Sequence, residues 1–198
     1  MFLLLVAAMG LPIVGRGQVP DSTSDSALEY RYRTEDDEAS VPYATTPRPL
    51  VDSMLSMAEV GPEDVVYDLG SGDGRIPIRA ARKYGARGVG IEINPELVDT
   101  ARAHAKAAGV ADRVAFRRAD FFEADIEDAT VVTLYLLPSV NLKLRSKLLR
   151  DLRPGTRVVS RDFHMAEWTP EETKEVGGTL VYLWRVPEEE PAFVEPNR

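Results

Sequence analysis

A glycine loop behind an apolar run holds the residues best suited to do chemistry. The stretch VVYDLGSGDGR, residues 65 to 75, places Gly70, Gly72 and Gly74 directly after a strand-like segment. Glycine lets bare backbone approach a ligand closely, and the carboxylates of Asp68 and Asp73 flank the loop. The alternative is a tight turn that needs glycine only for its positive φ.

The spacing of this loop departs from the dinucleotide fingerprint Gly-x-Gly-x-x-Gly. In that fingerprint the third glycine lets a helix pack closely while its amino terminus faces a pyrophosphate. Here Arg75 stands at the third position, and the extra glycine comes one residue earlier, at Gly74. Two carboxylates beside a diphosphate would repel it, because like charges destabilise each other at short range. The loop therefore favours a nucleoside that carries an amino acid, with Asp68 and Asp73 facing its ammonium.

Two more acidic residues follow the next two predicted strands. Glu92 ends the second strand, where a carboxylate can accept hydrogen bonds from both ribose hydroxyls. Asp120 follows the third strand and is placed to accept from an adenine amine, while the Phe121 amide can donate to the ring. The alternatives are a surface glutamate before a helix cap and plain core packing of the phenylalanine. The ordered set predicts one nucleoside site.

The elements that must position these residues alternate along the chain from Tyr43 onward. Four helices are expected, at 46–60, 75–84, 94–109 and 139–152. Seven strands are expected, at 64–69, 88–92, 113–119, 130–136, 156–163, 171–176 and 179–186. The last two form a hairpin with a tight turn at Gly177-Gly178. This order predicts an α/β fold with a mostly parallel, doubly wound sheet and an antiparallel C-terminal hairpin.

These segments together resemble a known family over residues 43 to 186. VVYDLGSGDGR, GVGIEI, the ADFF segment and TVVTLYLLP are similar to class I S-adenosylmethionine-dependent methyltransferases. More narrowly, VPYATTP, YDLGSGDGRI, TVVTLYLLPSVN, GTRVVS and YLWRV resemble the ATP-synthase c-subunit lysine methyltransferases and their prokaryotic relatives. Ala44-Thr45 depart from that pattern, which has valine and proline after the tyrosine.

The resemblance implies a Rossmann-like, seven-stranded sheet with a reversed final strand, S-adenosyl-L-methionine as methyl donor and a protein lysine as acceptor. Donor binding is then expected at Asp68, Gly70, Ser71, Gly72, Asp73, Gly74, Glu92, Ile93, Asp120 and Phe121. The catalytic segment that presents the acceptor is expected at Tyr135, Leu136 and Pro138, at the end of the fourth strand. No metal is required, because methyl transfer from a sulfonium needs mainly alignment and exclusion of water.

A lysine acceptor must lose its proton before it attacks. Its reference pKa is about 10.4, and an apolar channel lowers that pKa by penalising the ammonium. Leu136 stands where many nucleobase amino-methyltransferases carry Asn or Asp, which disfavours a nucleobase acceptor. Tyr43, His164 and Trp168 are candidates for the border of the channel, with ordinary packing as the alternative, and His104 is expected on the surface. Two other functions stay open: a small-molecule or other protein methyltransferase, and a noncatalytic S-adenosylmethionine-binding module.

Composition limits the remaining choices. The 198 residues, 44% of them hydrophobic, suit one domain with a real core. Without cysteine the chain has no disulfide, thiolate metal site or cysteine nucleophile, and two histidines leave little for a metal. The net charge of -8 resides at the ends, since residues 41–186 contain 20 basic and 21 acidic residues. That balance is unlike the basic face of a nucleic-acid binder.

The N-terminal segment predicts targeting or anchoring. Fourteen uncharged residues, 2–15, suit the apolar region of a secretory signal. We expect a signal-like or anchor segment at 1–20, an acidic linker at 21–42, the methyltransferase domain at 43–186 and an acidic tail at 187–198. Because the donor is made in the cytoplasm, the expected arrangement is a membrane-associated domain that faces the cytoplasm and has a membrane protein as substrate. Export and a wrongly assigned start of the sequence are the alternatives, and the sequence does not choose between them.

Overall fold

The computed structural model describes residues 30–31, 42–43, 45–189 and 191–193. The predicted segments 1–20 and 21–42 lie wholly or largely outside those residues, as do half of segment 187–198 and the side chain of Tyr43, so the domain boundaries stay predictions. Within the described ranges, no helix has both the length and the apolar character needed to span a bilayer.

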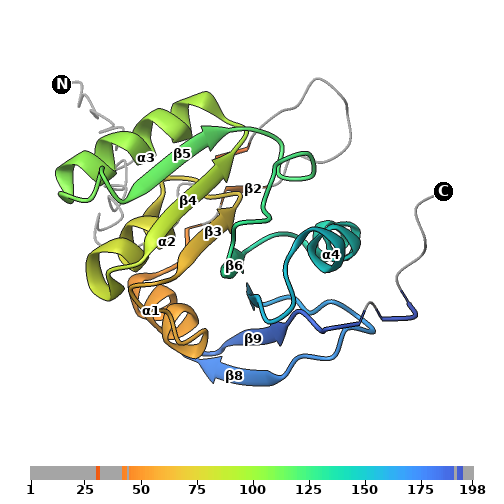
Figure 1. Ribbon diagram of the computed structural model, residues 1–198. Coiled ribbons are helices and arrows are strands. Elements are labelled where there is room, and N and C mark those ends of the chain that lie inside the picture. Colours follow the sequence, from red (N-terminus) through yellow and green to blue (C-terminus); the bar gives the residue numbers. More distant parts are fainter. Residues whose placement is uncertain (1–29, 32–41, 44, 190, 194–198) are drawn as a thin grey trace, which may run out of the picture.

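A seven-stranded mixed sheet forms the centre of the fold (Figure 1). Its strands are β3 (Val65–Leu69), β4 (Arg87–Glu92), β5 (Val114–Arg118), β6 (Val131–Leu134), β7 (Arg157–Arg161), β8 (Glu172–Val176) and β9 (Thr179–Arg185). Their order across the sheet is β5-β4-β3-β6-β7-β9-β8. The first five run parallel, and β9 pairs antiparallel with both β7 and β8. The predicted fold class is confirmed, and Gly177 and Gly178 both have positive φ in the hairpin turn.

Helices cover both faces of this sheet. They are α1 (Arg48–Met57), α2 (Arg75–Arg79), which continues as a π-helical turn (Ala80–Tyr84), α3 (Pro95–Ala107) and α4 (Pro138–Asp151). Successive side chains of a strand point to opposite faces. Val66 therefore packs in one cluster with α1 and α2, while Tyr67 packs in another with α4. A short antiparallel pair, β1 (Tyr30–Arg31) with β2 (Pro42–Tyr43), lies ahead of α1 in the chain.

The strand order reverses at β3, which lies between β4 and β6. In open sheets of this kind, ligands bind beyond the carboxyl ends of the strands at such a reversal. The glycine loop begins there, because Leu69 is the last residue of β3. The topology thus brings together the ends of β3, β4 and β6.

Two predictions in this region are wrong in detail. Strand β6 ends at Leu134 rather than 136, and α4 begins at Pro138 rather than Ser139. A proline disfavours helical backbone in the residue before it and suits the first turn of a helix, so Leu137 is extended, with φ -61° and ψ 152°, and the helix starts behind it. Tyr135 and Leu136 consequently lie in the link between β6 and α4.

Candidate functional site

The glycine loop needs its glycines for backbone conformation. Gly70, Gly72 and Gly74 have φ of 78°, 52° and 79°, which L side chains rarely adopt. The amides of Gly70 and Ser71 both donate to the Ile91 carbonyl, at 2.9 and 3.0 Å. These two bonds hold the start of the loop against the end of β4, so the turn alternative and the binding interpretation are compatible.

Glu92 fixes the next part of the loop. Its carboxylate is buried, and Oε2 accepts a hydrogen bond from the Gly72 amide at 3.0 Å. Oε1 accepts from the Asn94 amide at 2.9 Å, and the Asn94 side chain caps α3 by accepting from the Glu96 amide. A carboxylate has about four lone-pair positions. Glu92 can therefore hold the loop and still accept hydrogen bonds from a ligand.

Asp68 is buried at the end of β3, with 4% of its surface exposed. The Thr133 hydroxyl on β6 donates to its Oδ1 at 2.7 Å. Burial raises the pKa of Asp68 to about 7, with help from the charges of Asp73 and Glu92 and against the hydrogen bond from Thr133. The site therefore holds a carboxyl group that is poised to ionise near neutral pH.

This raised pKa predicts a pH-dependent stability. A carboxyl group whose folded-state pKa is raised adds stability below its unfolded pKa and loses it as the pH rises through the folded pKa. The free energy of unfolding of the wild type, relative to Asp68→Asn, should fall between pH 4 and pH 7, by up to about 4 kcal/mol. Urea unfolding at each pH measures it, and a difference that does not change with pH contradicts the assignment.

Asp73, the second predicted acid of the loop, is ion-paired with its neighbour. Arg75 Nε lies 2.9 Å from Asp73 Oδ1, and its Nη2 lies 2.7 Å from Oδ2. Burial by itself would raise the pKa of Asp73, but the hydrogen bonds and charge of Arg75 outweigh it and hold that pKa below its usual value. Asp68, at the end of β3, and Asp73, in the loop that follows, thus have pKa values shifted in opposite directions: that of Asp68 is raised and that of Asp73 is lowered.

The β6–α4 link meets this loop directly. Leu136 is buried, and a Cβ added at Gly70 would lie 3.0 Å from its Cδ2. Tyr135 is half-buried, its ring parallel to that of Phe163 at a centroid distance of 6.5 Å. Pro138 is exposed at the first position of α4. Of the three predicted acceptor residues, Leu136 contacts the glycine loop most closely.

The other predicted donor-binding residues, Ile93 and the adenine candidates Asp120 and Phe121, lie just beyond the ends of β4 and β5. Ile93 keeps 41% of its surface exposed, unusual for a large apolar side chain next to buried Glu92. Exposed Asp120 accepts a hydrogen bond from the Phe122 amide at 2.8 Å. The Phe121 and Phe122 rings lie 4.8 Å apart and pack against the core. The Ala119 amide donates to the Glu92 carbonyl at 3.1 Å, which brings these two strand ends together.

The structure places the remaining candidates, His104, His164 and Trp168, in different surroundings. His104 is exposed, as predicted, and its Nδ1 lies 3.1 Å from the Asp73 carbonyl. His164 is exposed, with its ring edge-on to Tyr182. Trp168, a candidate for the border of the channel, is instead a core residue: it is buried against Trp184, whose Nε1 donates to the Trp168 carbonyl at 2.6 Å.

Sequence reasoning missed two residues of the site. Thr133 is the polar residue within the buried run VVTL, and its polarity in that run was the available signal; the parallel register of β3 and β6 places it directly opposite Asp68. Arg161, at the end of β7, places its guanidinium carbon 3.9 Å from the centre of the Tyr135 ring. No pattern in the sequence relates Arg161 to Tyr135.

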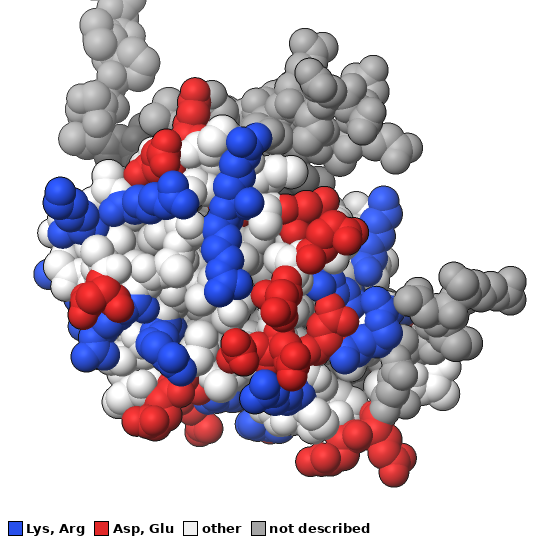
Figure 2. Space-filling model, turned by 45° about the horizontal axis from the view of Figure 1, so that its top comes forward, with Lys and Arg blue, Asp and Glu red and all other residues white. Residues whose placement is uncertain are grey.

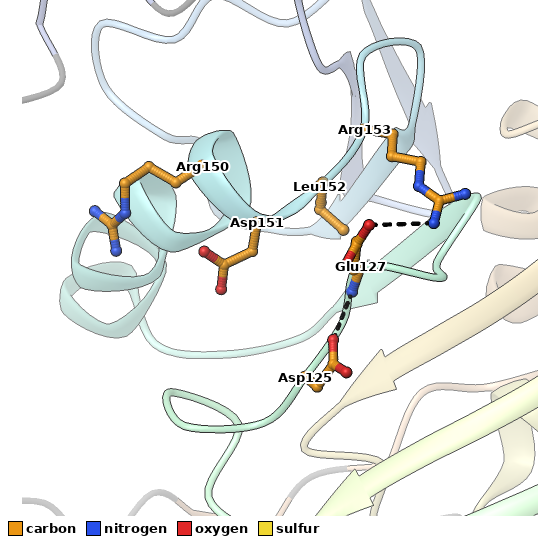
Figure 3. A pocket seen from close by; sticks show the side chains of 6 residues that line it. All are labelled: Asp125, Glu127, Arg150, Asp151, Leu152 and Arg153. Atoms are coloured by element: carbon orange, nitrogen blue, oxygen red, sulfur yellow. Dashed lines mark hydrogen bonds and ion pairs between the residues drawn. The ribbon is translucent and has the colours of Figure 1, made fainter.

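A hollow elsewhere on the molecule does not belong to this site. Figure 3 shows it between the segment that leads into β6 and the carboxyl end of α4, lined by Asp125, Glu127, Arg150, Asp151, Leu152 and Arg153. Each of these segments comes just before a parallel strand, so both lie where the amino ends of the strands meet, on the opposite side of the sheet from the glycine loop. Arg153 pairs there with Glu127 at 3.2 Å. In the described ranges, no group of three metal-ligating side chains is placed to hold a metal ion.

Sequence and structure comparisons find methyltransferases. The family model of the ANTKMT methyltransferase domain matches residues 68–172. A protein-lysine N-methyltransferase of Saccharolobus islandicus is 46% identical over 153 residues, which are 75% of this chain and 95% of the relative. The human ATP-synthase c-subunit lysine N-methyltransferase is 35% identical over 119 residues, which are 60% of this chain and only 51% of that longer protein.

The solved structures include one with high identity. It is a Salinibacter ruber protein, described as an RNA methyltransferase, in complex with S-adenosyl-L-homocysteine. It is 61% identical, with a TM-score of 0.75, and covers 77% of this chain and 100% of its own.

Proposed function

The chain belongs to the ANTKMT methyltransferase family and is an S-adenosylmethionine-dependent methyltransferase, and we propose that its acceptor is the side-chain amine of a protein lysine. The observation that carries the proposal is the 46% identity to a protein-lysine N-methyltransferase along 95% of that relative. The resemblance that the sequence indicated is confirmed by the family match.

The residues of the glycine loop fit the donor chemically. Gly70 leaves its α-carbon bare next to Leu136, where a Cβ would come within 3.0 Å. Ser71 Oγ is buried against Gly90, where an added Cβ would lie 2.5 Å from it, so this hydroxyl packs on β4 and any donor contact of Ser71 is assigned to its backbone. Asp68 offers a carboxyl group for an ammonium, and Glu92 can accept hydrogen bonds from ribose hydroxyls. We assign donor binding to these residues.

The chain's task in the reaction is alignment and exclusion of water. When bound, S-adenosylmethionine supplies an electrophilic methyl group on its sulfonium. The buried side chain of Leu136 and the half-buried ring of Tyr135 make the side of the site next to Gly70 apolar. Such surroundings penalise an ammonium, which lowers the pKa of an incoming lysine and favours the neutral amine that attacks in line. Carbonyl groups of the Tyr135–Leu137 link can orient that amine.

An RNA acceptor is the second candidate, because the Salinibacter ruber protein is described as an RNA methyltransferase and is 61% identical. Two observations favour protein over RNA. Leu136 offers no polar side chain to hold a planar exocyclic amine. Figure 2 shows basic and acidic side chains interspersed over the face in view, with no continuous basic surface. RNA binding draws much of its affinity from such a surface.

Radiolabelled S-adenosylmethionine separates the candidates. The purified chain is incubated separately with total protein, with total RNA and with the small-molecule extract of cells that lack the gene. We expect the label in protein, on the Nζ atom of lysine after hydrolysis, and loss of the signal when the protein is acetylated at its amines beforehand. Label in RNA alone would replace the proposal with the second candidate, and label in small molecules alone would refute both.

We further propose that the substrate is a membrane protein and that the domain works at the cytoplasmic face. The support is the uncharged run at residues 2–15 together with a donor made in the cytoplasm. Fractionated cells should yield the chain in membranes, and mass spectrometry of membrane proteins with and without the gene should reveal the methylated lysine. A chain found only outside the cell contradicts this.

A further inference from the structure

The ring of Tyr135 is held on the acceptor side by the last residue of β7, Arg161, and by Phe163 just after that strand. The Arg161 guanidinium carbon lies 3.9 Å from the ring centre, a close cation–π contact. The Phe163 ring lies parallel to the Tyr135 ring, with an interplanar angle of 4° and a centroid distance of 6.5 Å. The ring that stands beside the predicted acceptor position is therefore oriented by Arg161 and Phe163.

Arg161 is itself fixed by further contacts. Its Nε pairs with Asp162 Oδ2 at 3.1 Å, and 15% of its side chain is exposed. Asp162 has φ 65°, a conformation that non-glycine residues seldom adopt. Such strained residues persist where the surrounding structure over-determines them, often at functional sites. A buried amide supports the same loop, since Asn141 on α4 donates to the Phe163 carbonyl at 3.2 Å.

Arg161 also reaches the segment that leads into α1. Its Nη1 donates to the Thr45 carbonyl at 3.4 Å, while Arg75 Nη1 donates to the next carbonyl, that of Thr46, at 2.9 Å. Arg75 directly follows the glycine loop as the first residue of α2 and pairs with Asp73 of that loop. The Thr45–Thr46 segment is thus bound by one arginine from the donor side and by one from the acceptor side.

We propose that Arg161 is a positioning residue of the acceptor site, which orients the Tyr135 ring and holds it in register with the donor loop through the Thr45–Thr46 segment. This rests on the proposed function only in that a macromolecular acceptor enters beside Tyr135. Arg161 acts through Tyr135 and has no part in binding the donor. Its loss should therefore affect the use of the acceptor and leave donor affinity unchanged.

The test variant is Arg161→Met, which keeps the length of the side chain and removes the planar cation. We expect kcat/KM for the acceptor to fall about a hundredfold, because small misplacements in a site cost about that much. The dissociation constant for S-adenosylhomocysteine, measured by calorimetry, should stay within about twofold of wild type.

Arg157 provides a matched control on the same strand. Its side chain is 16% exposed, and its guanidinium pairs with Asp64 and donates to the Ala58 carbonyl, far from Tyr135 at the other end of β7. Arg157→Met should lower the melting temperature and leave kcat/KM of the folded enzyme near wild type. If both variants lose kcat/KM equally, Arg161 has only a structural role.

A double-mutant cycle with Tyr135→Ala tests the route of the effect. Residues that act as a unit are non-additive. In the Tyr135→Ala background, Arg161→Met should lower kcat/KM less than threefold. If the two substitutions instead have fully additive effects on the free energy derived from kcat/KM, the proposal is overturned. The cycle uses whichever acceptor, total protein or total RNA, the wild type labels. Labelled RNA with a non-additive cycle refutes the lysine proposal alone, whereas wild-type kcat/KM in Arg161→Met refutes the role of Arg161 alone.

Discussion

Replacing Glu92 by alanine is expected to lower the affinity for S-adenosylhomocysteine by at least about a hundredfold. Glu92 is buried, and its two oxygens accept from the amides of Gly72 and Asn94. In the proposed donor site the variant loses charged hydrogen bonds to the ribose, each contributing about 1.5–3 kcal/mol, and it also loses the hydrogen bond that holds the glycine loop. Two such bonds at the lower limit correspond to about a hundredfold. Equilibrium dialysis with radiolabelled ligand measures the loss.

A control variant separates this effect from the loss of one negative charge. Glu172, on edge strand β8, is exposed and far from the glycine loop in the sheet order. Glu172→Ala should bind the ligand as tightly as wild type. Circular dichroism of Glu92→Ala shows whether the fold persists. A folded Glu92→Ala variant that binds within threefold of wild type would mean that the ribose does not contact Glu92.

Gly74→Ala is expected to cost about 2–4 kcal/mol in the free energy of unfolding. Gly74 has φ 79°, and a Cβ there would lie 2.5 Å from Phe116 Cζ and 2.8 Å from Ala101 Cβ. The left-handed conformation costs a non-glycine residue about 1 kcal/mol or more, and overpacking of a core adds about 1–3 kcal/mol. Urea denaturation monitored by circular dichroism measures the sum.

Gly109 is a control that separates the conformational cost from the steric cost at Gly74. It has φ 70°, and a Cβ there would have no atom within 4 Å. Gly109→Ala should cost only the conformational part, about 1 kcal/mol. A second change, Phe116→Leu, should recover part of the loss in the Gly74→Ala background by removing ring atoms. Equal losses in Gly74→Ala and Gly109→Ala would show that the packing around Gly74 relaxes.

Gly74 also explains the departure from the dinucleotide spacing. Its α-carbon lies against α3 and Phe116 of β5, so the third glycine allows close packing here one position earlier than in that fingerprint. Arg75 stands where the fingerprint has its third glycine; it pairs with Asp73 and donates a hydrogen bond to the Thr46 carbonyl. The sequence of the loop predicted a ligand other than a dinucleotide, and the structure shows that packing against α3 and Phe116 requires the glycine at position 74.

Local patterns predicted most of the fold because each element carries its own signal. Asn94 and Pro95 start α3, Gly85 ends the π-helical turn with φ 74°, and Gly177-Gly178 forms the hairpin turn. The apolar run at β6 is buried throughout, as expected for a strand covered on both faces. Glu92 and Asp68 could be placed because each ends or nearly ends a parallel strand beside the reversal.

The acceptor side could not be predicted in the same way. Tyr135 and Arg161 lie 26 positions apart and meet only because β6 and β7 are neighbours in the sheet. Trp168 looked like a candidate at the border of the channel, yet burial against Trp184 makes it part of the core. Such contacts depend on tertiary packing between distant parts of the chain, and the periodicity of apolar residues within one helix or strand does not predict them.

On the proposed assignment, the glycine loop, together with Asp68 and Glu92, binds a sulfonium nucleoside rather than a dinucleotide. Isothermal titration calorimetry of the purified chain with S-adenosylhomocysteine and with NAD tests it most directly. We expect saturable one-to-one heat with S-adenosylhomocysteine and none with NAD. Saturable binding of NAD, with no heat from S-adenosylhomocysteine, would contradict it.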